Sequence, residues 1–140
     1  MYGLIGGTAN AIEPEKRMLS SMTPTIVQKD GRLVMVAGSP GGPRIINTVL
    51  QVIVNVLDFD LTVQAAVDAP RIHHQWVPDI IYFEKDRPIP EAVQTELRAL
   101  GHTLKERSGI GEAHAIYYDA EKDVYFGGAD SREEGAAVGY

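Results

Sequence analysis

The sequence predicts an α+β layered fold, in which antiparallel hairpins lie toward both ends of the chain and helices lie between them. β-Branched runs at residues 25–27 and 33–37 flank the turn-forming residues 29–31, which indicates a first hairpin. Runs of aromatic, aliphatic and β-branched side chains at residues 113–118 and 124–127 indicate a second hairpin. The segments between the two hairpins carry helical periodicity, and this mixture defines the predicted fold class.

Two helices are expected directly after the first hairpin. Apolar residues recur every three to four positions over residues 44–57, and the breadth of this stripe indicates burial on more than one side. Residues 61–69 predict a second, shorter helix with Thr62 as its N-cap. Pro70 closes that helix, because the residue before a proline disfavours the α conformation.

A strand, a helix and a further strand are expected in the second half of the chain. Residues 80–84 and 102–105 predict the strands, and residues 90–100 predict the helix. Pro90 suits the first turn of that helix, and Gly101 suits its C-cap. The apolar side chains of the helix fit one face: Val93, Leu97 and Leu100.

Composition and charge narrow the class of protein. The chain has 140 residues, 44% of them hydrophobic, which is enough for one globular domain. Its net charge of −6 argues against a surface for nucleic acid or anionic membranes. No apolar run approaches the ~20 residues that span a bilayer, and we recognise no signal peptide. The absence of cysteine excludes disulfides, thiol nucleophiles and cysteine-based zinc sites.

Two short polar segments point to a binding or catalytic site. Ser20 and Ser21 precede the first strand of the first hairpin, and Gly41 and Gly42 follow its second strand. A tight turn between antiparallel strands places these outer ends side by side. Glycine N–H groups can point into a cavity, and two such donors before a helix can form an oxyanion hole. Serine hydroxyls can hold a carboxylate without adding charge.

These and other polar groups also have structural interpretations. A Ser-Pro-Gly-Gly loop before a helix is most often a turn followed by a cap. His73 and His74 suggest a metal or acid–base site, but neighbours on an extended segment point to opposite faces. We therefore expect no metal and no other cofactor. Asp130 and Arg132 are expected to form an exposed pair worth ~0–1 kcal/mol. A Ser-His-Asp triad using His114 is disfavoured, because no nucleophile-elbow motif is present.

Five short motifs occur along the chain: Tyr-Gly-Leu-Ile-Gly-Gly at residues 2–7, Leu-Ser-Ser-Met at 19–22, Gly-Ser-Pro-Gly-Gly at 38–42, Arg-Ile-His-His-Gln-Trp at 71–76 and Gly-Tyr at 139–140. Together they resemble the C-terminal part of the γ-glutamyltranspeptidases. Each motif is weak alone, but their order and spacing agree over the whole chain. The sequence is thus similar to a family that hydrolyses or transfers the γ-glutamyl group of glutathione and related compounds.

The resemblance implies an N-terminal-nucleophile hydrolase fold, a four-layer αββα sandwich, and a precursor that cleaves itself. In that family the freed N-terminal threonine of the small subunit attacks the γ-glutamyl amide, with its own α-amine as base. The γ-glutamyl ester then passes to water or to an acceptor amine. Gly41 and Gly42 match the family's oxyanion-hole glycines. Ser20 and Ser21 match the pair that holds the substrate's α-carboxylate.

The sequence also departs from the family pattern. The nucleophilic threonine and the Asp-Asp-Phe element that grips the substrate's α-amino group are absent. Residues 1–140 are therefore expected to form a single incomplete domain, the C-terminal portion of a small subunit. Pro43 stands where many relatives have serine, which removes one N–H from the loop. The resemblance also makes residues 71–76 a structural loop, which we expect to form hydrogen bonds and to pack around Trp76.

These departures determine what the chain is expected to do by itself. We expect the isolated chain to be inactive, and its partners to be the large subunit, the remainder of the small subunit and a γ-glutamyl substrate such as glutathione. Missing layers should leave an apolar face exposed, which favours self-association. The family resemblance suggests a periplasmic or secreted location in bacteria.

Two other functions remain open from the sequence. A related acylase, such as a cephalosporin acylase or a poly-γ-glutamate depolymerase, would use the same machinery on another acyl group. A non-catalytic binding or assembly domain would keep the fold and bind nothing at the serine and glycine pairs. The serine pair favours the γ-glutamyl function over the acylases, because it matches recognition of a free α-carboxylate.

Overall fold

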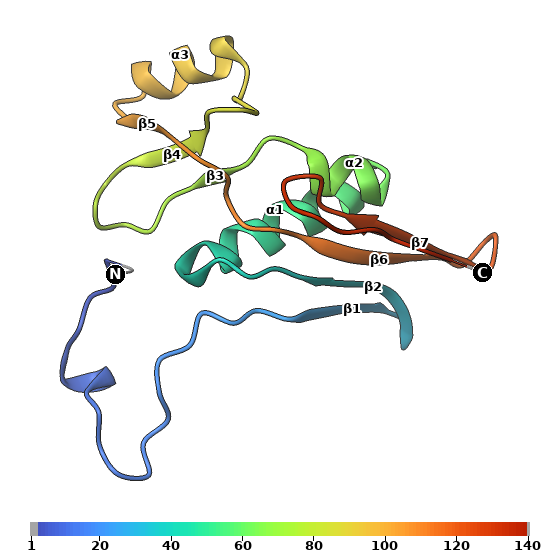
Figure 1. Cartoon of the computed structure of the whole chain (residues 1–140), viewed down its shortest axis with the longest axis horizontal. Helices are drawn as coiled ribbons and strands as arrows, with labels where there is room; N and C mark the ends of the chain where they lie inside the picture. The colour runs from blue at the N-terminus through green and yellow to red at the C-terminus, as the bar shows by residue number, and fades with distance from the viewer. Residues whose placement is uncertain (1–2, 140) are drawn as a thin grey trace.

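In the computed structural model, which describes residues 3–139, two β-sheets lie next to each other (Figure 1). Residues 3–24, before the first strand, are mostly exposed and loop out below the larger sheet in Figure 1, and they return to the fold at Gly3, whose carbonyl oxygen accepts a hydrogen bond from Gln75 at 3.3 Å. The strands are β1 (Thr25–Lys29), β2 (Arg32–Gly38), β3 (Ile72–His73), β4 (Ile81–Glu84), β5 (Leu104–Arg107), β6 (His114–Asp119) and β7 (Val124–Ala129). The helices are the 3₁₀ turns η1 (Thr8–Asn10) and η2 (Gly42–Arg44), and α1 (Ile45–Leu57), α2 (Val63–Asp68) and α3 (Glu91–Ala99).

The larger sheet is antiparallel, with the strand order β1-β2-β6-β7. Asp30 (φ 52°) and Gly31 (φ 75°) form the two-residue turn of the first hairpin, and both adopt the positive φ that such turns require. Helices α1 and α2 cover one face of this sheet, and the core lies between them. Its buried members include Met35, Ala37, Val49, Val52, Val56, Val63, Ala66, Val67, Ala113 and Ala115.

On β1, β2 and β6 the opposite face of the larger sheet is apolar and uncovered, whereas Ala137 of the C-terminal segment lies against Gly127 of β7. Ile26, Val36 and Ile116 lie directly across from one another on β1, β2 and β6, and 66%, 37% and 48% of their surfaces are exposed. Because side chains alternate along a strand, these three share the face opposite to the buried Met35 and Ala37. The described residues therefore pack helices on one face of this sheet and leave these apolar side chains exposed on the other.

The smaller sheet has the order β3-β4-β5. Strand β4 pairs antiparallel with β3 and parallel with β5, and α3 forms the crossover between the parallel strands. Ile81 and Phe83 of β4 are buried, whereas Val93 and Leu100 of the α3 segment stay exposed. No helix within residues 3–139 is long and apolar enough to cross a membrane.

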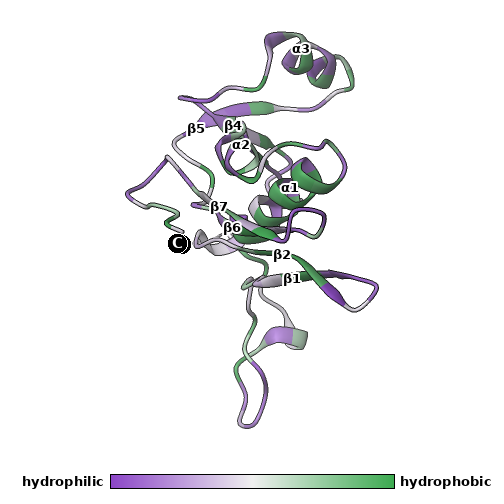
Figure 2. Ribbon diagram, turned by 90° about the vertical axis from the view of Figure 1, so that its right-hand side faces the viewer, coloured by the Kyte–Doolittle hydropathy of each residue, from purple (hydrophilic) through white to green (hydrophobic). Residues whose placement is uncertain are grey.

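The predicted hairpins and helices are confirmed, with boundaries shifted by at most two residues. Thr62 caps α2 as predicted, since its Oγ1 accepts a hydrogen bond from the Ala65 N–H at 3.2 Å. The two-residue strand β3 was not predicted, because it is too short to show alternation. The expectation that α1 is buried on more than one side is wrong for this chain, since Ile46 and Leu50 are half exposed. Figure 2 shows that α1 is hydrophobic along most of its length.

Candidate functional site

The first hairpin brings the serine pair and the glycine pair together at its open end. The Ser21 hydroxyl donates a hydrogen bond to the Gly42 carbonyl oxygen at 2.8 Å. The Ser20 Oγ accepts a hydrogen bond from the Met22 N–H at 3.2 Å. In this contact Ser20 acts only as an acceptor. Its own hydroxyl proton has no hydrogen-bond acceptor among residues 3–139 and is free to bind a ligand. Ser20 is exposed and Ser21 is half-buried.

Gly41 and Gly42 present free backbone donors. Gly41 has φ 137° and Gly42 has φ 61°, a region of backbone conformation that favours glycine. Gly42 begins the 3₁₀ turn η2, and Gly41 is its N-cap, so neither N–H has an intrahelical acceptor. Within residues 3–139 neither N–H donates to another group. Two adjacent donors before a helix can stabilise a carboxylate or a developing oxyanion.

A cleft of about 540 Å³ opens beside Gly41. Its walls come from the glycine loop, from residues 84–87, from residues 108–112 and from residues 131–133. The loop at residues 109–112 packs against the glycine loop, because a Cβ on Gly41 would lie 3.4 Å from the Gly111 Cα. The Glu112 N–H also donates to the Ser39 Oγ at 3.1 Å. The glycine loop and the loop at residues 109–112 are therefore in direct contact.

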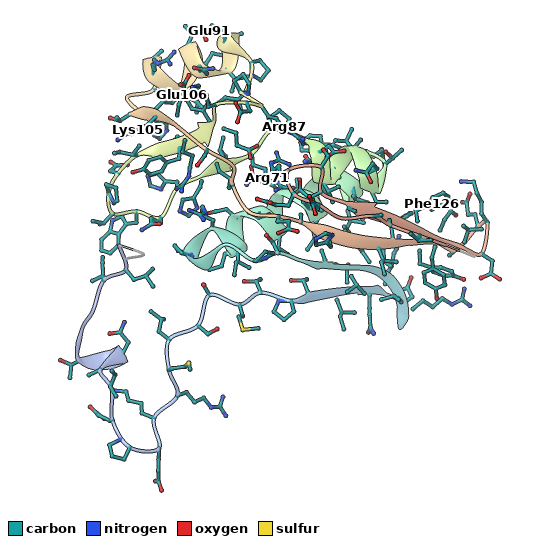
Figure 3. All side chains as sticks on the ribbon, viewed as in Figure 1. Arg71, Arg87, Glu91, Lys105, Glu106 and Phe126 are labelled. Carbon is teal, nitrogen blue, oxygen red and sulfur yellow. The ribbon has the colours of Figure 1, made fainter. Side chains whose placement is uncertain are left out.

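A buried network of four charged side chains holds that second loop. Arg71, Glu84, Asp130 and Arg132 meet at the junction of the two sheets, where Figure 3 shows Arg71. Arg132 binds Glu84 through two hydrogen bonds of 2.5 and 2.6 Å, and Asp130 lies 2.7 Å from Arg71 and 3.0 Å from Arg132.

The same charged groups bind the backbone of the loop. Glu84 accepts the Ile110 N–H at 2.9 Å, and Arg71 donates to the Ile110 carbonyl oxygen, also at 2.9 Å. Asp130 accepts the Ala113 N–H at 2.7 Å. Removing one member of such a buried network leaves an unpaired buried charge, which typically costs about 3–5 kcal/mol.

The network corrects the expectation that Asp130 and Arg132 form a weak exposed pair. Their side chains are 0% and 8% exposed. Burial alone would raise the pKa of Asp130, but the hydrogen bond from Ala113 and the charge of Arg71 outweigh burial and hold the pKa below its usual range. The partner Glu84 lies 48 positions from Arg132 in sequence, so spacing gave no sign of it.

Residues 71–76 have a structural role, but their arrangement differs from the expectation. His73 is buried, with its ring nitrogens 2.6 Å from Asn47 Oδ1 and 2.9 Å from Gln75 Oε1. His74 contacts Asp79 at 2.9 Å. The predicted packing around Trp76 is wrong, because that side chain is 73% exposed. Within the described residues, no three histidine, aspartate or glutamate side chains gather in a way that could hold a metal ion.

Comparison with known proteins assigns the family. The family model described as gamma-glutamyltranspeptidase matches residues 1–140. The chain belongs to the γ-glutamyltranspeptidase family. The glutathione hydrolase proenzyme of Escherichia coli (strain K12) is 47% identical over 94% of this chain, and that of Pseudomonas aeruginosa is 46% identical over 86%. The chain spans about 22% of the length of each of these relatives.

Solved γ-glutamyltranspeptidase structures share the fold. The T380A mutant of the Helicobacter pylori γ-glutamyltranspeptidase is 46% identical, with a TM-score of 0.88 over 95% of this chain and 72% of that chain. The Pseudomonas nitroreducens γ-glutamyltranspeptidase, solved as a complex with L-DON, is 42% identical, with a TM-score of 0.89 over 99% of this chain and 72% of that chain. These relatives are N-terminal-nucleophile hydrolases, so the predicted α+β fold class is confirmed.

Proposed function

We propose that this chain supplies the oxyanion hole and the α-carboxylate site of an enzyme that hydrolyses or transfers γ-glutamyl groups. Glutathione and other γ-glutamyl compounds would be its substrates. The observation that carries the proposal is the contact between Ser21 and Gly42, which joins the two segments that the family uses for these tasks. Membership of a family whose close relatives are glutathione hydrolase proenzymes supports the same activity.

Each residue has a separate role in this proposal. Ser20 donates a hydrogen bond from its hydroxyl group to the α-carboxylate of the γ-glutamyl group, and the Ser21 hydroxyl rotates away from the Gly42 carbonyl oxygen to do the same. The N–H groups of Gly41 and Gly42 stabilise the oxyanion that forms when the amide carbonyl is attacked. The proposed mechanism requires no cofactor, because backbone and hydroxyl donors supply this stabilisation.

The remaining parts of the site would come from outside these 140 residues. The proposed nucleophile is an N-terminal threonine freed by self-cleavage of a precursor, and a second element grips the substrate's α-amino group. The large subunit and the rest of the small subunit would be the partners of this chain. The uncovered face with Ile26, Val36 and Ile116 is where we place the second sheet of the αββα sandwich. In the isolated chain, the same face would favour self-association.

The acylase alternative has weaker support. The cephalosporin acylase of Bacillus halodurans is 26% identical, with a TM-score of 0.67, and the transpeptidase CapD of Bacillus anthracis is 25% identical, with a TM-score of 0.74. The γ-glutamyltranspeptidases reach 42–47% identity. The similarity therefore favours γ-glutamyl substrates.

The test compares a full-length protein that contains this chain with the isolated 140 residues. Each sample receives γ-glutamyl-p-nitroanilide, and released p-nitroaniline is measured. Intact masses and N-terminal sequencing show whether the full-length protein has been cleaved. We expect two subunits, an N-terminal threonine on the smaller one and activity only in the processed protein. An unprocessed, inactive full-length protein would overturn the proposal and favour a binding or assembly domain.

The family resemblance also supports a periplasmic or secreted location in a bacterial source. Fractionation of source cells, with γ-glutamyl-p-nitroanilide hydrolysis measured in each fraction, tests this part of the proposal. Activity confined to the cytoplasmic fraction would contradict it.

A further inference from the structure

A smaller pocket lies next to the glycine loop, and positively charged side chains line it. It has a volume of about 250 Å³, and its walls include Pro43, Arg44, Gln75, Tyr82 and Arg107. Arg44 also lines the larger cleft, so the two hollows share one side chain. Among the residues that the structure describes, the walls of the small pocket include two arginines and no acidic side chain, although the whole chain carries a net charge of −6.

Within residues 3–139, neither arginine has a carboxylate partner. Among the described arginines, Arg71, Arg87, Arg98 and Arg132 form ion pairs, and Arg17 and Arg32 are exposed. Arg44 and Arg107 are the described arginines that are partly buried and yet form no ion pair, and both lie in this pocket.

The local contacts leave the donors of the two guanidinium groups largely unused. The Arg44 Nε is buried without a hydrogen-bond partner within residues 3–139. Arg107 lies over the Tyr82 ring, 5.5 Å from its centroid, and its Nε donates only a 3.3 Å hydrogen bond to the Ser108 carbonyl oxygen. Burial and the charge of Arg44 both lower the pKa of Arg107. Because guanidinium groups stay protonated in proteins, the two like charges repel each other unless an anion lies between them.

We propose that this pocket binds a small anion through Arg44 and Arg107. The ligand class is a carboxylate or a phosphate, because a planar guanidinium matches the oxygens of either group with paired hydrogen bonds. Two sources share this chemistry: a free anion in solution, or a second carboxylate carried by a γ-glutamyl peptide, such as the C-terminal carboxylate of glutathione. The second source rests on the function proposed above.

The position of Arg44 links the pocket to the glycine loop. Arg44 ends η2 and its N–H donates to the Gly41 carbonyl oxygen at 3.3 Å. Its Nε lies 3.9 Å from the point where a Cβ on Gly41 would be. An anion that fixes the Arg44 side chain therefore also supports the backbone that presents the two free N–H groups.

Calorimetric titration with inorganic phosphate tests the site directly. The full-length protein is titrated at constant ionic strength, together with Arg107→Gln and with Arg98→Gln, an arginine of α3 outside the pocket, as the matched control. We expect saturable binding of one phosphate in the wild type and in Arg98→Gln, and at least about tenfold weaker binding in Arg107→Gln. Circular dichroism checks that each variant is folded, and this measurement needs no enzyme activity.

A kinetic comparison distinguishes the two sources. KM is measured for glutathione and for glutathione with its glycine carboxylate converted to an amide. If the peptide supplies the carboxylate, Arg107→Gln raises KM for glutathione about tenfold and leaves KM for the amide unchanged. If a free anion is the ligand, phosphate binds and the ratio of the two KM values is the same in wild type and variant.

No saturable phosphate binding, together with an unchanged KM ratio, would overturn the proposal. Failure of the proposed function would instead appear as no turnover of either peptide.

Discussion

The Ser21 hydroxyl donates a hydrogen bond to the Gly42 carbonyl oxygen across 2.8 Å, although 21 positions separate the two residues in sequence. This contact closes the open end of the β1-β2 hairpin. It fixes the serine segment against the loop whose N–H groups are free. The proposed carboxylate site and the proposed oxyanion hole are therefore one structural unit. A substitution in either should alter the geometry of the other.

Loss of a serine hydroxyl should weaken substrate binding. Ser20→Ala and Ser21→Ala each remove a proposed hydrogen bond to a charged carboxylate, which is worth about 1.5–3 kcal/mol, so kcat/KM should fall roughly 10- to 100-fold. Steady-state hydrolysis of γ-glutamyl-p-nitroanilide by the full-length protein measures this. Thr95→Ala removes a hydroxyl group from the exposed surface of α3, outside the site, and should leave kcat/KM unchanged. Equal kinetics for all three variants would contradict the carboxylate role.

A side chain at Gly41 should reduce the rate more than the affinity. Gly41→Ala is strained at φ 137° and brings its Cβ to 3.4 Å from the Gly111 Cα, so the N–H donors should move. Loss of one oxyanion donor typically lowers kcat on the order of 100–1000-fold. Gly38→Ala is the control, since nothing lies within 4 Å of its new Cβ. A rise in KM without a fall in kcat would argue against an oxyanion hole.

The buried network should contribute far more to stability than a surface pair. Glu84→Gln leaves Arg132 without its buried carboxylate and should lower the free energy of unfolding by about 3–5 kcal/mol. Glu91→Gln makes the same chemical change in the exposed pair with Arg98 and should cost at most ~1 kcal/mol. Denaturant unfolding of the two variants compares these losses of stability. Equal losses would contradict the claim that the buried network stabilises the fold more than the exposed pair.

Stability should fall as the pH falls below about 6.5 because of His73. Burial lowers the pKa of His73 from 6.5, the charges of Arg107 and Arg44 lower it further, and the hydrogen bond with Gln75 opposes them. Between pH 6.5 and the lower folded pKa, the unfolded state takes up a proton that the folded state does not, so unfolding is favoured as pH falls.

The unfolding free energy measured at about pH 7.5, 6.5 and 5.5 checks this sign. His73→Gln should flatten the slope in that range, whereas His102→Gln, a change at an exposed histidine, should not. A His73→Gln slope equal to that of the wild type would show that another group is responsible.

Local patterns in the sequence predict most of the elements, and they fail where the structure depends on distant partners. The Asp30–Gly31 turn and the Thr62 cap follow from residue types at fixed short spacings, and both are present. The Arg132–Glu84 pair spans 48 positions and joins two sheets, so no periodicity indicates it. The serine and glycine pairs were found because one hairpin brings them together. Their roles still depend on residues beyond those described.

The most direct test of the account is a structure of the processed full-length protein with glutamate bound. We predict that the α-carboxylate of glutamate lies within about 3 Å of the Ser20 and Ser21 hydroxyl oxygens, with the γ-carboxyl group facing the Gly41 and Gly42 N–H groups. Glutamate bound elsewhere, with both serines and both glycines free of contact, would contradict the central claim.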